Sequence, residues 1–188
     1  MTADFAAPFL FGYKMAEICL RGEQLWLRSG IAGVALAAEG EARCYQHPEH
    51  IPPVVGCRCG FFAKRRAEAL VLYARYPYSQ LLEVELTGRI RTTREDLRGQ
   101  YQRLLRILML PHCVRCGAEA TLLGVSDQVD PRAELFGEPA LSSLCESCTS
   151  PRWWLPEEVA EELSVPVSWA VPQEALVLHG VGMQLGDH

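Results

Sequence analysis

Four of the eight cysteines occur as two closely spaced pairs in the second half of the chain. Cys113 and Cys116 are separated by two residues, Cys145 and Cys148 repeat that spacing, and 28 residues lie between the pairs. Two intervening residues let both thiolates of a pair reach one ion, and structural zinc takes four ligands in a tetrahedron. Gly117 follows the first pair, where a tight turn requires a positive φ angle. The spacing predicts a zinc site at these four cysteines.

This arrangement resembles a zinc ribbon over residues 111–150, which implies two knuckles that hold one metal ion between them. A site with four thiolate ligands has no open coordination position, so we expect it to stabilise structure and not to catalyse. Unrelated thiols and an iron–sulfur cluster are the alternatives. The stretch between the pairs is longer than the usual 15 to 20 or so residues. We expect it to contain a hairpin or a helix near residues 131–136.

A second group of metal-binding residue types lies in the first half of the chain. Cys44, Cys57 and Cys59 fall within 16 residues, and His47 and His50 lie between the first two of them. Three cysteines and one histidine are a ligand set that zinc accepts, and either histidine can be the fourth ligand. The alternatives are packed thiols, loop histidines, or a redox pair at Cys57 and Cys59 that would need an exposed thiolate.

The same segment carries a longer motif, a Cys followed by His-x-x-Pro-x3-Cys-x-Cys-Gly-apolar-aromatic-Ala. Its positions are Cys44, His50, Pro53, Cys57, Cys59, Gly60, Phe61, Phe62 and Ala63. The motif resembles one in small actinobacterial zinc-site proteins of unassigned function. Weaker matches at Gly12-Tyr13-Lys14 and Gly88-Arg89-Ile90 extend the resemblance over residues 11–105. It implies a zinc-stabilised, β-rich domain with His50 as the ligand, and it supplies no activity.

Several elements must position these residues. Residues 18–20 and 25–27 are apolar runs around a polar turn at Gly22, which predicts a β-hairpin with Cys19 as a packed core thiol. The pattern of residues 81–90 predicts a strand, and residues 62–75 have helical periodicity. Residues 93–110 fit a capping box followed by leucines at helical spacing, so we favour a helix there over a strand. Residues 156–163 predict a short helix with Val159 and Leu163 facing inward.

Composition and charge limit the class of protein. The chain has 188 residues, of which 49% are hydrophobic and 22% charged, which is typical of folded globular proteins. No apolar run reaches the roughly 18 residues that a membrane helix needs, and no basic residue precedes the first apolar stretch as in a secretory signal. We therefore expect a cytoplasmic location and reduced thiols. Residues 1–110 carry a net charge of +4 and residues 111–188 one of −9, which indicates two units with different surfaces.

Two surface features are candidate partner sites. Basic residues concentrate between Arg58 and Arg106, with tyrosines among them, and include Arg65, Arg66, Arg89 and Arg91. This run is either a solvated face, a docking surface for the acidic half, or a site that binds phosphates or an acidic protein. Trp153 and Trp154 follow the second Cys pair. Adjacent tryptophans serve either as an exposed anchor for a partner or as part of a small core.

Known catalytic motifs are missing from the sequence: it has no phosphate-binding glycine loop, no HExxH and no GxSxG. The His47-Pro-Glu49 and Pro111-His-Cys113 segments resemble the zinc deaminase signature, but with one extra residue before the cysteine and with the second Cys pair left unused.

We predict an α+β protein. A β-rich zinc domain (1–110) is followed by a zinc ribbon (111–150) and by an acidic extension with a short helix (151–188), which we expect to pack on the rest. The predicted function is a non-catalytic adapter that holds two zinc ions and binds a protein partner. One alternative is a zinc protein that binds RNA or single-stranded DNA through the basic run. The other is a zinc-dependent hydrolase or deaminase.

Overall fold

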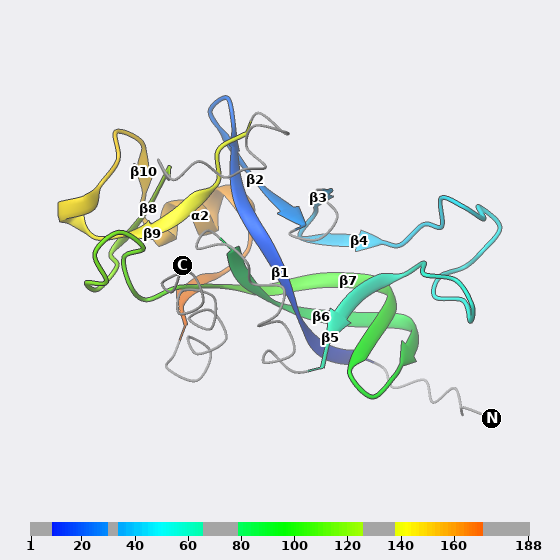
Figure 1. Ribbon diagram of the computed structural model, residues 1–188. Coiled ribbons are helices and arrows are strands. Elements are labelled where there is room, and N and C mark those ends of the chain that lie inside the picture. The colour runs from blue at the N-terminus through cyan, green and yellow to red at the C-terminus, as the bar shows by residue number, and fades with distance from the viewer. Residues whose placement is uncertain (1–8, 30–33, 66–78, 126–137, 171–188) are drawn as a thin grey trace, which may run out of the picture.

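A long antiparallel hairpin forms the centre of the fold (Figure 1). Its strands are β6 (Ser79–Thr92) and β7 (Asp96–Met109), which pair along nearly their whole length. The computed structural model describes residues 9–29, 34–65, 79–125 and 138–170. Within them strands predominate and one α-helix occurs, so the predicted β-rich α+β class is confirmed.

The first strand, β1 (Phe9–Arg21), belongs to two pairings. Its N-terminal part pairs antiparallel with β6, and its C-terminal part pairs with β2 (Gln24–Ser29). In the second pairing Ile18 lies opposite Leu27 and Leu20 opposite Leu25, so the predicted hairpin is confirmed. Cys19 is fully buried in it, as expected of a packed thiol. The short strand β3 (Ala35–Leu36) extends the sheet beyond β2.

The sheet closes on itself through β5 (Phe61–Lys64). This strand pairs with β7 and meets β1 at one position, Tyr13 opposite Lys64, so β1, β6, β7 and β5 form a ring. The apolar side chains packed in and beside the ring form the main core and include Ala63, Leu82, Val84, Leu86, Leu97 and Leu104. The strand predicted at residues 81–90 is confirmed as part of β6.

Two of the predicted helices differ from the structure. Residues 96–109 are the strand β7, so the helix favoured there is wrong. The Thr93 hydroxyl does accept a hydrogen bond from the Asp96 N–H at 3.0 Å, but this contact closes the β6–β7 turn. The helix predicted over residues 62–75 is wrong at Phe62–Lys64, which lie in β5, and its remainder falls mostly on residues 66–78, outside the described part.

A smaller three-stranded sheet carries the second cysteine group. It consists of β8 (Leu122–Val125), β9 (Leu141–Leu144) and β10 (Trp153–Trp154), with β8 in the middle. A 3-10 turn, η2 (Glu146–Cys148), follows β9. Leu123 and Leu141 belong to the main core, so the two sheets pack against one another. The element expected near residues 131–136 lies outside the described residues.

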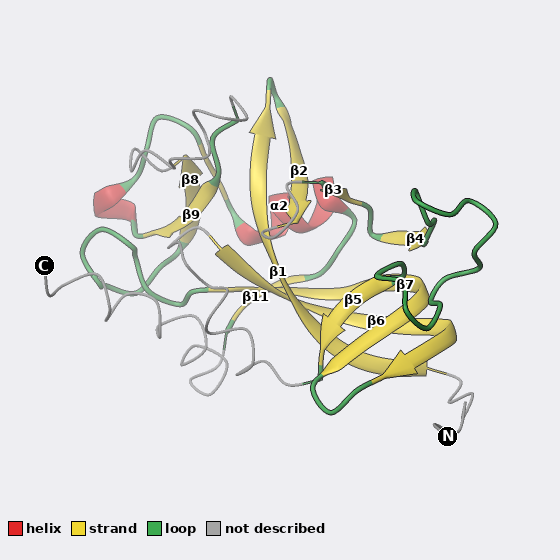
Figure 2. Cartoon of the chain, turned by 45° about the vertical axis from the view of Figure 1, so that its right-hand side comes forward, coloured by secondary structure: helices red, strands yellow, loops and turns green. Residues whose placement is uncertain are grey.

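The segment after β10 returns to the large sheet. The helix α2 (Pro156–Leu163) forms as predicted, with Val159 fully buried and Leu163 packed against the core. Pro156 begins it, where a missing N–H costs nothing. The next strand, β11 (Val167–Trp169), pairs in parallel with the end of β7 (Figure 2). No helix in the described ranges has the length and apolarity to cross a membrane.

Candidate metal centres

The first cysteine group lies on a loop inserted into one edge of the sheet. Both β4 (Glu39–Glu41) and β5 pair antiparallel with the same strand, β7. Glu41 lies opposite Tyr101, the Ala42 N–H donates to the Gln100 carbonyl, and Phe61 lies opposite Gly99. Residues 42 and 61 therefore occupy successive positions along β7. The intervening segment, residues 43–60, is the metal loop, which projects away from the sheet (Figure 1).

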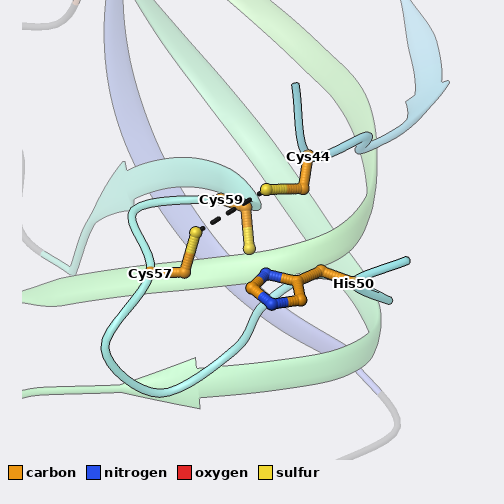
Figure 3. Close-up of side chains that lie close together, drawn as sticks. All are labelled: Cys44, His50, Cys57 and Cys59. Carbon is orange, nitrogen blue, oxygen red and sulfur yellow. Dashed lines mark hydrogen bonds between the residues drawn. The ribbon is translucent and has the colours of Figure 1, made fainter. Parts of the chain in front are cut away.

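The loop brings Cys44, His50, Cys57 and Cys59 together (Figure 3). One ligand atom from each lies within 4.8 Å of the others, and the sulfurs of Cys44 and Cys57 are 3.7 Å apart. Sulfurs bound to one tetrahedral zinc at about 2.3 Å would be about 3.8 Å apart. A disulfide would need about 2 Å. The observed spacing therefore fits two ligands of one metal ion.

His50, and not His47, belongs to this group of four. The Nδ1 atom of His50 is buried and has no hydrogen-bond partner, which leaves it available for a metal ion. Its Nε2 atom lies 4.0 Å from an oxygen of the exposed Glu49 side chain, which is beyond hydrogen-bond distance. The His47 ring stacks on His50 at 4.6 Å and is exposed. His50 thus has both the position and the free atom that a ligand needs.

The local electrostatics favour a thiolate in this group. A hydrogen bond from the Cys59 backbone N–H is the main cause that lowers the pKa of Cys57 to about 6. Burial is the main cause that raises the pKa of Cys59. Thiolates are the form that binds metals. A bound cation would favour ionisation of the remaining thiols.

The backbone of Gly60 and two arginine side chains fix the loop to the sheet. Gly60 has a φ of +101°, and a Cβ there would lie 3.1 Å from the Pro53 Cβ and 3.3 Å from the Gly99 carbonyl. Only glycine can adopt this positive φ without strain and also leave room for the Pro53 side chain and the Gly99 carbonyl. Arg98 donates to the Arg58 carbonyl, and Arg91 donates to the Val54 carbonyl at 3.4 Å. These contacts connect both sides of the β6–β7 hairpin to the metal loop.

The second group, Cys113, Cys116, Cys145 and Cys148, comes together at the opposite end of the molecule, beside β8 and β9 (Figures 1 and 2). The Gly117 N–H donates to the Cys113 carbonyl at 2.9 Å, and Gly117 has the expected positive φ of +77°. At the second pair the turn is tighter by one residue, since the Cys148 N–H donates to the Cys145 carbonyl at 3.0 Å. Cys116 and Cys145 sulfurs lie 3.6 Å apart, again close to a tetrahedral edge. Two tight turns facing each other are compatible with a zinc-ribbon-like site.

The four thiols of the second group cannot all ionise unaided. Burial tends to raise the pKa of Cys113, but backbone N–H groups of Cys145, Arg115 and Cys116 donate to it and hold the pKa at about 6. Hydrogen bonding with Cys116 and Cys145 is the main cause that raises the pKa of Cys148 to about 12. One thiolate therefore opposes the ionisation of the next. A divalent cation would relieve this opposition.

The residues predicted to bind a partner differ in how far they are exposed to solvent. Trp153 is 48% exposed, whereas Trp154 packs against the main core and lies under the Arg152 guanidinium. Arg65 and Arg89 are exposed, Arg91 is half-buried, and Arg66 lies outside the described residues. One tryptophan of the pair is therefore about half exposed, and the other packs against the core.

Much of the basic run is engaged within the protein. Arg103 pairs with Glu85 at 2.8 Å, Arg106 with Glu83 at 3.1 Å and Lys64 with Asp96 at 2.6 Å. Arg91 and Arg98 face the metal loop, as described above. These ion pairs could not be predicted from the sequence, because Glu83 and Glu85 lie on a neighbouring strand and strand register cannot be read from composition.

The residues of the deaminase-like signature are not assembled in the described chain. His47 and Glu49 lie beside the first group, and Cys113 lies in the second, at the other end of the molecule. Sequence reasoning also missed two residues that hold the loop of the first group through its carbonyl oxygens, Arg91 and Arg98.

Both groups thus have donor atoms, spacing and turn geometry suited to structural metal ions. Comparisons of the chain with models of known protein families, with curated proteins and with solved structures gave no match.

Proposed function

We propose that the protein is a non-catalytic module, stabilised by two zinc ions, that binds a protein partner through the metal loop. The observation that carries this proposal is the exposure of large apolar side chains on that loop. Tyr45 is 94% exposed, Val55 77% and Ile51 50%. Apolar side chains grouped on a projecting segment are typical of interaction sites.

Zinc is the metal that best suits both groups. Seven cysteine thiolates and one imidazole are soft or borderline ligands, and sulfur spacings of 3.7 and 3.6 Å match a small tetrahedral ion. Each group supplies four protein ligands, so neither has a coordination position left for a substrate. The chemistry therefore supports a structural role at both sites.

A metal-closed loop suits partner binding because its base is already fixed. Four ligands, the Gly60 turn and two arginine hydrogen bonds hold the loop, while its apolar side chains remain in solvent. A loop that is ordered before binding loses less conformational entropy on association. Trp153, beside the second centre, is a further exposed contact for a partner.

A protein partner is favoured over a nucleic acid. Affinity for nucleic acids comes mainly from cations that neutralise phosphates. In the basic run Lys64, Arg103 and Arg106 already pair with carboxylates, and two arginines bind loop carbonyls. Among the described residues of the run, Arg58, Arg65, Arg89 and Arg94 are left as exposed cations for an RNA or a single strand, which is fewer than the sequence of the run suggests.

The metal content tests the first part of the proposal. Native mass spectrometry of the purified protein should show two zinc ions. A Cys59→Ser variant should retain the ion of the second centre, and a Cys116→Ser variant that of the first. A protein that keeps its fold in strong chelator, with no metal bound, would contradict the structural role.

A matched pair of variants tests the second part. In a Tyr45→Ser/Val55→Ser variant, both zinc ions should remain and binding to the partner should be lost. The control is Phe11→Ser, which removes an aromatic ring that is 53% exposed and lies outside the metal loop. Partners should be identified by proximity labelling and then bound as purified proteins. Undiminished binding by the loop variant would contradict the proposal, as would binding that nuclease or moderate salt abolishes.

A further inference from the structure

A cavity of about 740 Å³ opens between the strand ring and the segment that leads into the metal loop. Its lining comes from β1, from residues 34–46 and from residues 57–62 at the start of β5, and includes Lys14, Leu36, Gly40, Arg43 and Phe61. Sites for small molecules usually occupy about 300 to 1,000 Å³, and the mouth of a closed sheet is a common location for them. The cavity therefore has the size and place of a ligand site.

Lys14 is the unusual residue of this lining. Side chains alternate along a strand, so Lys14 shares a face of β1 with Gly12, Ala16 and Ile18, which are buried in or beside the ring. A lysine on such a face loses hydration, and burial lowers the pKa of Lys14 to about 8. Lys14 therefore places a cation, at neutral pH, on a face of β1 where an aliphatic side chain would be expected.

The Lys14 ammonium group is only partly satisfied. One contact is a 2.7 Å hydrogen bond to the Oε1 atom of Gln102, and another is the ring of Phe61, whose centroid lies 5.6 Å away. No carboxylate of the described residues lies within ion-pair distance of it. An ammonium group has three N–H donors, so the amide oxygen leaves two without a strong acceptor. A negative group in the cavity would complete this coordination.

The remaining charges of the lining indicate how a ligand would lie. Glu39 and Glu41 offset Arg43 and Arg58, which are all exposed, so Lys14 is the inner charge. Phe61 and Leu36 give apolar surface, and Cys44, Cys57 and Cys59 of the first metal centre also line the cavity. A single cation favours a carboxylate over a phosphate, which usually needs several donors.

We propose that this cavity binds a small organic acid, with its carboxylate on the Lys14 Nζ atom and its apolar body along Phe61 and Leu36. The ligand does not coordinate the metal centre, whose four positions come from the protein. Of the three exposed apolar side chains of the metal loop, Tyr45 also lines the cavity, whereas Ile51 and Val55 do not. The residues that would hold the ligand, Lys14, Leu36 and Phe61, lie outside the loop, so their role does not depend on the partner that the loop binds.

The test is calorimetric titration of the zinc-loaded protein with phenylacetate, indole-3-acetate and octanoate, each compared with its neutral amide. At least one acid should bind at least about tenfold more tightly than its amide, since a hydrogen bond to a charged group contributes about 1.5 to 3 kcal/mol. Lys14→Met should weaken acid binding by the same factor and leave amide binding unchanged. Arg103→Met, which removes an exposed charge outside the cavity, should change neither.

Lys14→Gln provides a second variant, since it keeps a donor for Gln102 if Lys14→Met does not fold. Zinc content and thermal unfolding show whether each variant is native. Equal affinity for acids and amides, no binding of any acid, or acid binding unaffected in both Lys14 variants would overturn the proposal. A zinc content below two in the wild type would contradict the proposed function and would not affect this result.

Discussion

Gly60 gives a physical reason for the glycine that ends the Cys-x-Cys-Gly motif. Its φ of +101° disfavours any side chain, and a Cβ would also press on Pro53 and on the Gly99 carbonyl. Gly60→Ala should therefore lower the free energy of unfolding by about 1 to 3 kcal/mol, and zinc should pass faster to a chelator. Thermal unfolding and the rate of zinc transfer measure the two effects.

Gly56 in the same loop is the control for this substitution. It also has a positive φ, +84°, but no atom would lie within 4 Å of an added Cβ. Gly56→Ala should therefore be milder than Gly60→Ala, because it introduces backbone strain without a collision. Equal effects of the two substitutions would show that the packing against Pro53 is unimportant.

The buried amine of Lys14 predicts a pH dependence of stability. Its pKa is lowered from 10.5 to about 8, so between these pH values the unfolded chain binds more protons than the folded chain. The free energy of unfolding should then rise with pH across this window, by at most about 3 kcal/mol. Lys14→Met should lack this rise, whereas Arg103→Met should keep it. Urea denaturation at pH values below, within and above this window measures how the free energy of unfolding changes with pH. The same change in wild type and in Lys14→Met would refute the attribution of the pH dependence to Lys14.

At the scale of single residues, the sequence identifies most of the candidate metal ligands. Cysteine spacing alone groups Cys113 with Cys116 and Cys145 with Cys148, because chelation by one ion constrains separation along the chain. The choice of His50 over His47 came from a resemblance, and the structure adds the buried Nδ1 atom. Lys14 was not recognised as a functional candidate, since its position inside the ring depends on strand closure far along the chain.

At the scale of elements, β7 shows why periodicity can mislead. Along β7, successive buried residues are separated alternately by two and by three positions. They are Leu97, Gly99, Gln102, Leu104 and Ile107. The register with β6 shifts near the same places, between Glu83 and Val84 and between Thr87 and Ile90. Bulges of this kind break the period of two and produce spacings close to those of a helix. The regular hairpin of β1 and β2 has no such shift, and its prediction was right.

The insertion between β4 and β5 predicts that the metal loop is dispensable for the sheet. Deleting residues 43–60 would join Ala42 to Phe61, which lie opposite Gln100 and Gly99, so the register along β7 is preserved. The shortened protein should fold, keep its strand content by circular dichroism and bind a single zinc ion. Its stability should match that of Cys59→Ser or exceed it. An unfolded deletion variant beside a folded Cys59→Ser would show that the loop supports the sheet directly.

At the scale of the whole molecule, the two metal centres lie at opposite ends (Figure 1). Sites without shared contacts usually contribute to stability independently. Disruption of one centre by Cys116→Ser should therefore change the zinc affinity of the other by less than about 0.5 kcal/mol, and Cys59→Ser should behave in the same way. Chelator competition in each variant measures this affinity. A larger change would reveal coupling through the core that the two sheets share.

The charge asymmetry of the sequence indicates a basic first half and an acidic second half, but it does not predict which residues of the two halves are in contact. The acidic half contacts the β1–β2 hairpin: Glu138 pairs with Arg21, Arg152 with Glu23 at 3.1 Å, and Glu162 accepts from the Leu25 N–H at 2.5 Å. The basic run between Arg58 and Arg106 pairs instead within its own sheet. Net charge indicates attraction between regions, whereas strand pairing determines which side chains are adjacent.

The insertion of the metal loop also affects the order of events during synthesis. All four ligands of the first centre have been translated by residue 59, whereas the strand that holds both ends of the loop begins at Asp96. Closing a short loop costs less entropy than pairing strands that are about 60 residues apart. We therefore expect a nascent chain to capture its first zinc ion while β7 is still inside the ribosome. Stalled chains that end before residue 96 should bind zinc, and the Cys59→Ser change should abolish that binding.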